Sequence, residues 1–211
     1  MAKTRNKASQ AHKPKKESSG RKDLFYYRAS VATHPMFFVI FSLLLFYAFP
    51  VNASGLQLMQ ELVAGIVLFA LLPFSLMYKP IKRGEITVNL ENQEKRNKFF
   101  LPWAIIFASA FVFYSYFNAA PHASLALSFF MAMLLLHFVN PRSKISWHAM
   151  GLSIITIVLA HYYGAAALAL FATVVPFACF ARLQLRAHTP FQLMAGAVSG
   201  IAIAFAALAI A

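Results

Sequence analysis

Two side chains that can bind or attack an anion stand at the start of the last apolar segment. Arg182 precedes His188 by six residues, and His188 is followed directly by Thr189 and Pro190. Threonine is a favoured N-cap and proline suits the first helical position, so a helix is predicted to begin at Thr189. Gln192 completes a capping-box pattern. The free N–H groups of this helix would face the arginine and the histidine, which predicts an anion site.

A second segment repeats this chemistry. Lys144 precedes Ser146, a predicted N-cap, and His148 lies two residues further on, at the start of another apolar run. One histidine near a helix end is more often an interfacial residue than a catalytic one. Two of them, each beside a cation and a helix start, favour a shared site. Histidine can act as a nucleophile or a general acid near neutral pH, and cations can neutralise phosphoryl oxygens.

The composition indicates which elements position these residues. The chain has 211 residues, of which 60% are hydrophobic and only 12% are charged, about half the charged share of a soluble domain. Long apolar runs predict an all-α, polytopic membrane helical bundle. About seven transmembrane helices are expected, at 35–53, 57–79, 99–118, 122–139, 146–163, 165–180 and 190–210.

The cations predict the topology of this bundle. All 19 Lys and Arg lie in the N-terminal tail or in the regions 79–98, 142–144 and 182–186, and the other connections have none. The positive-inside rule then places the N-terminus and the candidate site in the cytoplasm, and the C-terminus outside the cell membrane. Glu61 lies about one turn from the external end of the second span, where we expect it to snorkel to the interface.

Two domains are predicted. Residues 1–28 are polar and basic and are expected to be a disordered cytoplasmic tail, and residues 29–211 form the transmembrane domain. The tail is interpreted as a topogenic extension, with anionic lipid as the alternative partner and no specific nucleic acid expected. Gly196 and Gly200 form a G-x-x-x-G pattern, which is equally compatible with close helix contact and with two tolerated small residues.

The two chemical segments resemble a known family. Arg182, His188 and Gln192 resemble the third motif, S-R-x-x-x-x-x-H-x-x-x-D, of the type 2 phosphatidic acid phosphatase superfamily of membrane lipid phosphatases. The segment Lys144-Ile145-Ser146-Trp147-His148 resembles its second motif in the K-I-S-x-H form of a prokaryotic branch. The H-T-P-x-Q-x-x-x-G-x-x-x-G sequence from His188 is similar to the same branch. The resemblance covers roughly residues 90–205.

The resemblance implies a fold and a set of roles. The fold would be a six-helix lipid phosphatase core plus one N-terminal helix. His188 would be the nucleophile that forms a phosphohistidine, and His148 the general acid. Phosphoryl oxygens would be held by Arg182 and Ser146, and also by Lys144 and Arg96, our candidates for the cations of the first motif, which has no clean copy here. Gln192 would orient His188. This chemistry needs no metal or other cofactor.

Two departures leave alternatives open. Ala181 replaces the serine of the third motif, and Gln192 replaces its aspartate. The leading interpretation is a phosphatase (a hydrolase) acting on an isoprenyl or glycerolipid phosphate or diphosphate. The alternative is a weak or inactive relative that binds anionic lipid or a membrane protein partner. A transporter ranks last, because few ionisable residues are expected inside the spans.

Overall fold

All secondary structure that the chain shows in the described regions is helical. The computed structural model describes residues 21–51, 55–88, 90 and 92–211. The π-helical segment η1 continues α3 into α4, so these three form one long helical rod. The helices are α1 (Arg21–Ala32), α2 (Pro35–Ala48), α3 (Gly55–Gly65), η1 (Ile66–Leu71), α4 (Leu72–Lys82), α5 (Gln93–Tyr116), α6 (Ala120–Val139), α7 (Trp147–Tyr163), α8 (Ala165–Gln184) and α9 (Pro190–Leu208).

Six helical stretches of the described chain are long and apolar enough to cross a membrane, so the protein is compatible with an integral membrane protein. They are Leu24–Ala48, Gly55–Lys82, Gln93–Tyr116, Ala120–Val139, Ala165–Gln184 and Pro190–Leu208. The predicted count of seven is not confirmed. The remaining expected span corresponds to α7, which has 17 residues and is largely buried by its neighbours.

The first helical stretch starts earlier than the sequence indicated. We expected a tail up to residue 28 and a first span at 35–53, whereas α1 is helical from Arg21 and α2 ends at Ala48. Helix α1 packs against α8: the Tyr26 ring lies edge-on against Phe180, with 5.8 Å between ring centroids. Residues 1–20 of the predicted tail lie outside the described residues.

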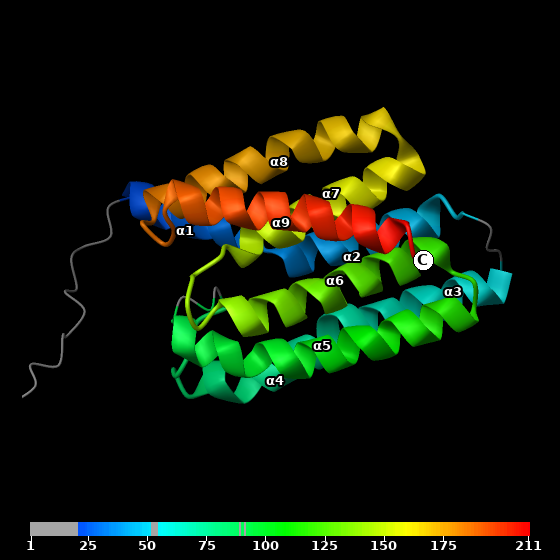
Figure 1. The fold of residues 1–211 in the computed structure, drawn as a ribbon, viewed down its shortest axis with the longest axis horizontal. Helices are drawn as coiled ribbons and strands as arrows, with labels where there is room; N and C mark the ends of the chain where they lie inside the picture. Colours follow the sequence, from blue (N-terminus) through cyan, green and yellow to red (C-terminus); the bar gives the residue numbers. More distant parts are fainter. Residues whose placement is uncertain (1–20, 52–54, 89, 91) are drawn as a thin grey trace, which may run out of the picture.

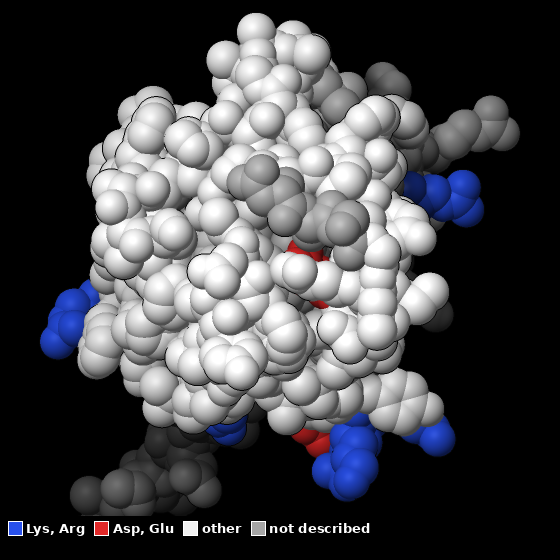
Figure 2. Space-filling view, turned by 90° about the vertical axis from the view of Figure 1, so that its right-hand side faces the viewer, with Lys and Arg blue, Asp and Glu red and all other residues white. Residues whose placement is uncertain are grey.

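The helices run roughly along one axis, and their connections lie at two ends (Figure 1). We use "basic end" for the end that carries the α4–α5, α6–α7 and α8–α9 connections, and "opposite end" for the other. Figure 2 views the opposite end, which is mostly white with a small acidic patch near its centre, and lysines and arginines are visible only at its rim. The structure therefore separates the cations along the bundle as the sequence does, without showing how the bundle is oriented in a membrane.

Close contact between α7 and α9 positions the basic end. A Cβ atom added to Gly196 would lie 2.5 Å from the carbonyl oxygen of Ser146, and one on Gly200 would lie closer still to that of Met150. The G-x-x-x-G pattern is therefore a close helix contact. It lets the Ser146 N–H donate a hydrogen bond to the Gln192 carbonyl at 3.2 Å, which ties the start of α7 to the start of α9.

Candidate functional site

Four of the predicted site residues line one small cavity at the basic end. Arg96 comes from the first turn of α5, His148 from the first turn of α7 and Arg182 from the last turn of α8. His188 comes from the loop before α9. All four are buried, with exposed fractions of 1 to 7%. Segments separated by more than 80 residues in sequence therefore meet at this point.

The capping box of α9 fixes the nucleophile candidate. The Thr189 side chain accepts from the Gln192 N–H, and the Gln192 side chain accepts from the Thr189 N–H, as predicted. The same Gln192 Oε1 lies 3.2 Å from His188 Nδ1. An amide oxygen can only accept, so Nδ1 carries the proton and Nε2 keeps its lone pair. Gln192 thus both caps the helix and orients the His188 ring.

The surroundings of His188 keep its ring neutral. Burial is the main cause that lowers the pKa of His188 to about 3, and the Arg182 charge is the next. The charges of Lys144 and Arg96 lower this pKa further, whereas the hydrogen bond to Gln192 opposes the shift. At neutral pH the imidazole is uncharged, which is the form that can act as a nucleophile.

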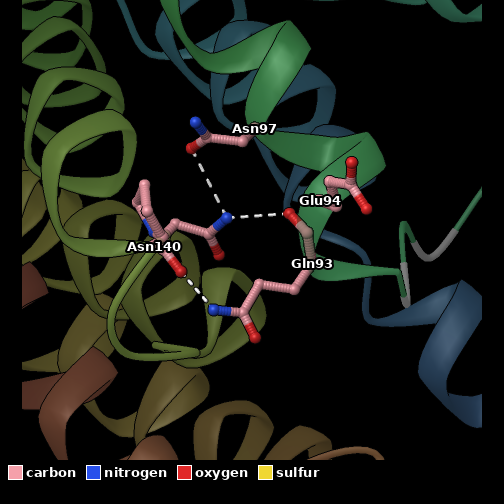
Figure 3. A pocket seen from close by; sticks show the side chains of 5 residues that line it. Gln93, Glu94, Asn97 and Asn140 are labelled. Carbon is pink, nitrogen blue, oxygen red and sulfur yellow. Dashed lines mark hydrogen bonds between the residues drawn. The ribbon is translucent and has the colours of Figure 1, made fainter.

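Arg96 is held by a residue that the sequence analysis missed. Asn140, the fully buried C-cap of α6, accepts at its side-chain oxygen from Arg96 Nε at 2.6 Å and also from Arg96 Nη2. Its amide group donates to the Gln93 carbonyl at 2.9 Å, and the Gln93 side chain donates back to the Asn140 carbonyl (Figure 3). An asparagine just before a proline, at the end of an apolar run, was the signal available in the sequence.

Two other predicted residues lie next to the cavity rather than in its lining. Ser146 is the N-cap of α7, and its hydroxyl accepts from the Ala149 N–H at 3.4 Å. Lys144 donates from Nζ to the Ala187 carbonyl at 3.1 Å, in the turn before His188. Lys144 therefore supports the loop and adds positive charge to the site, while Ser146 supports the helix that carries His148.

Helix α1 supplies two residues that the sequence analysis did not assign to the site. The fully buried Ser30 accepts at Oγ from Arg182 Nη1 at 3.0 Å, and its carbonyl lies 3.2 Å from His148 Nε2. His34 packs edge-on against His148, with 4.9 Å between ring centroids. The His34-Pro35 pair at a helix start was a signal for His34. Nothing in the sequence identified Ser30.

The cavity has the electrostatic character of an anion site. Its described lining consists of two arginines, two histidines, Leu90, Phe100 and Trp147, with no acidic side chain among them. The indole N–H of Trp147 is buried and has no hydrogen-bond partner among the described residues. The cavity offers about 10 Å³ to water, which is room for about one molecule. These donors suit an oxyanion ligand. The present cavity is too small for a phosphate, so the side chains around it must move apart before one can bind.

A second buried polar cluster lies at the opposite end. Glu61 is only 3% exposed, so the expectation that it snorkels to the interface is wrong. Its carboxylate accepts from Gln57 at 2.9 Å and lies 3.5 Å from His122 Nδ1. The Tyr114 ring stacks on His122, and its hydroxyl donates to the Glu61 carbonyl. Glu61 is buried because Tyr114 and His122 from other helices pack against it, and the sequence of one span does not show these partners.

Metal ligands do not gather in the parts of the chain that are described: no group of three or more His, Cys, Asp or Glu side chains there could hold an ion. Comparison of the chain with family models, with curated proteins and with solved structures found no match.

Proposed function

We propose that this protein is a membrane lipid phosphatase that hydrolyses an isoprenyl or glycerolipid phosphate or diphosphate at the basic end of the bundle. The observation that carries the proposal is the meeting of Arg96, Arg182, His148 and His188 in one buried cavity without an acidic side chain in its described lining. Two guanidinium groups can hold phosphoryl oxygens, and the two histidines supply the nucleophile and the proton donor.

The proposed reaction has two steps. His188 Nε2 uses its lone pair to attack phosphorus, the bond from phosphorus to the leaving oxygen breaks, and His148 gives that oxygen its proton. Water then attacks the phosphohistidine and gives its proton back to His148, the phosphorus–nitrogen bond breaks, and phosphate leaves. Lys144 and the Arg96–Asn140 pair keep the cavity positive, which stabilises the additional negative charge of the transition state.

The neutral Gln192 is the main departure from the resembled motif. An aspartate at this position would stabilise the positive charge that His188 gains when it attacks. Gln192 supplies orientation through its hydrogen bond to Nδ1, but no charge. We therefore propose a slower enzyme than one with a carboxylate here, since loss of the orienting carboxylate in a comparable histidine system costs about 10⁴-fold.

The proposed membrane orientation follows from the cations. With the basic end cytoplasmic, the phosphate head group enters the cavity from the cytoplasmic surface while the lipid tail stays in the bilayer. The apolar faces of the bundle support this, because leucine, phenylalanine and valine side chains along its helices are exposed. Large exposed apolar surface of this kind is expected on helices that contact lipid tails.

Phosphate release tests the proposal directly. Purified protein would be assayed against isoprenyl phosphates, isoprenyl diphosphates, phosphatidate and phosphatidylglycerol phosphate, with His188→Ala alongside. His161→Ala is the matched control, since His161 is exposed at the opposite end. We expect release by the wild type and by His161→Ala, and none by His188→Ala. Equal release by wild type and His188→Ala would contradict the mechanism.

A non-catalytic protein that binds anionic lipid is the second candidate. Two observations favour it, the uncharged Gln192 beside His188 and the small volume of the cavity. This candidate predicts that folded wild-type protein binds a lipid phosphate but releases no phosphate from any member of the panel.

A further inference from the structure

We infer that the last turn of α1 is a gate that occupies the anion site, and that two oxygens of Ser30 mark the positions where two phosphoryl oxygens bind. This inference rests on the proposed function, since it describes regulation of the same site. It concerns α1, which lies outside the segment that resembles the lipid phosphatases.

Ser30 engages the two groups that a bound phosphate needs. Its hydroxyl oxygen accepts from Arg182 Nη1 at 3.0 Å, and its carbonyl oxygen lies 3.2 Å from His148 Nε2. A carbonyl oxygen can only accept, so His148 must be donating from Nε2. The phosphate-binding cation and the proton donor are therefore both directed at Ser30.

The open space beside these donors is too small for a phosphate in this state, and α1 occupies Arg182 Nη1 and His148 Nε2 from the other side. About 10 Å³ is open to water, which is much less than a phosphate group needs. Ser30 is fully buried and His34 packs against His148 at 4.9 Å. An oxyanion can reach Arg182 and His148 together only after these contacts have opened.

The charge of the site gives the anion an advantage over Ser30. Arg96 and Arg182 line the cavity, and Lys144 acts on it from the adjoining turn. The Ser30 oxygens are neutral dipoles, whereas a phosphate brings full negative charge to the same donors. Charge-assisted hydrogen bonds are about twice as strong as neutral ones, so a phosphate can displace the serine.

The chain has a break where α1 can turn. Helix α1 ends at Ala32, and His34 adopts an extended backbone conformation (φ −65°, ψ 133°) before α2 begins at Pro35. Helix α1 packs mainly on α8, through contacts that include the Tyr26–Phe180 ring pair. Rotation about the Thr33–His34 junction would move Ser30 without unfolding either helix.

The first test measures whether Ser30→Ala raises or lowers the affinity for phosphate. If Ser30 competes with the anion, Ser30→Ala removes one competing oxygen and should tighten binding of inorganic phosphate roughly tenfold. If Ser30 instead helps to bind the anion, the same change weakens binding. Binding would be followed by the fluorescence of Trp147, which lines the cavity, in a Trp103→Phe background that leaves Trp147 as the single tryptophan.

Ser42→Ala is the matched control for this test, because Ser42 is also fully buried and its hydroxyl donates to the Phe38 carbonyl in α2. It should leave phosphate affinity unchanged. Unchanged or weaker phosphate binding by Ser30→Ala would overturn the inference. Absence of phosphate binding by both wild type and Ser30→Ala would overturn it as well.

The second test holds α1 in place. In a Cys179→Ser background, Tyr26→Cys and Phe180→Cys would be joined by a short bis-methanethiosulfonate reagent, whose disulfides are cleaved by dithiothreitol. We expect cross-linking to weaken phosphate binding at least tenfold and reduction to restore it. A control pair at the opposite end, Phe49→Cys with Tyr163→Cys, uses the contact in which the Tyr163 hydroxyl donates to the Phe49 carbonyl.

Full phosphate affinity in the protein cross-linked between α1 and α8 would overturn the gate. Because both tests measure phosphate binding, they do not depend on turnover. Phosphate binding that follows the predicted pattern without any hydrolysis would contradict the proposed enzyme and leave the gate standing.

Discussion

The two buried polar clusters of this bundle treat charge in different ways. At the opposite end, Glu61 and His122 are 3.5 Å apart, and Gln57 donates to the same carboxylate. An acid and a base lie together there, so the cluster can balance its own charge. At the basic end, Arg96 and Arg182 line a cavity whose described lining has no acidic residue.

The opposite-end cluster contains both an acid and a base, whereas the basic-end cluster has cations without an acidic partner in its described lining. Burying a charge is costly unless a partner compensates for it. Asn140 and Ser30 give the arginines neutral oxygens at the basic end, which satisfy hydrogen bonds without cancelling the charge. We therefore expect the basic-end cluster to respond to anions, and the Glu61 cluster to contribute to stability alone.

The largest expected effect is on phosphate release by Arg182→Met. Removing a guanidinium that holds phosphoryl oxygens should lower the rate about a thousandfold. Glu61→Gln, which keeps the shape of the other cluster, should change release less than about twofold. Thermal unfolding would be measured in parallel to confirm that both variants fold. A loss of release in Glu61→Gln as large as that in Arg182→Met would break the division between the two clusters.

The α7–α9 contact provides the next largest effect. Gly196→Ala places a methyl group against the Ser146 carbonyl, and Gly200→Ala places one against Met150. Each should lower the free energy of unfolding by about 3 kcal/mol, measured by chemical denaturation in detergent. Gly196→Ala should also weaken phosphate binding, because Ser146 adjoins the basic-end cavity. A Gly84→Ala control has open space around the new methyl group but a positive φ of 69°, so it reports backbone strain only.

Much of the basic end could be predicted from the sequence because its signals are local. Thr189, Pro190 and Gln192 form a capping box within four residues, and the structure shows both hydrogen bonds of that box. The long apolar runs likewise indicate a membrane helical bundle, although only six described stretches qualify as spans. Local patterns identify where helices start and which side chains lie near those starts.

The missing parts depend on contacts between distant segments. Ser30 reaches Arg182 across 152 residues and His148 across 118, and a serine just before the first long apolar run has no local pattern that indicates such a partner. Asn140 and Arg96 are 44 residues apart. Glu61 was misassigned for the same reason, since its burial depends on His122 from α6. The packing between helices determines these contacts, and no local pattern in a single sequence predicts that packing.

The Glu61 cluster predicts a stability effect without a change in phosphate binding. Glu61→Ala removes one acceptor of the Gln57 amide group and the carboxylate that lies 3.5 Å from His122 Nδ1, and it leaves a cavity in a buried cluster. We expect a loss of about 2 kcal/mol in the free energy of unfolding, measured by chemical denaturation in detergent. Phosphate affinity should stay at the wild-type value. Glu61→Gln is the milder control, because its side-chain oxygen can still accept from Gln57.

A pH dependence of stability belongs to the basic end. The folded protein holds the pKa of His188 at about 3, against 6.5 for the ordinary group, so the unfolded chain binds a proton first as the pH falls. This group's contribution to stability is complete above pH 6.5 and is lost towards pH 3, at up to about 1.4 kcal/mol per pH unit. Subtracting the unfolding profile of His188→Asn from that of the wild type isolates this slope.

Inorganic phosphate should reduce the slope, since its negative charge beside His188 opposes the effect of the arginines and raises the pKa of the ring. Glu61→Gln should leave the same difference profile unchanged, because the Glu61 cluster lies at the other end of the bundle. A slope that ignored phosphate would mean that the anion does not reach His188. The cations of the basic end would then serve only to set its charge, and the contrast between the two clusters would lose its functional meaning.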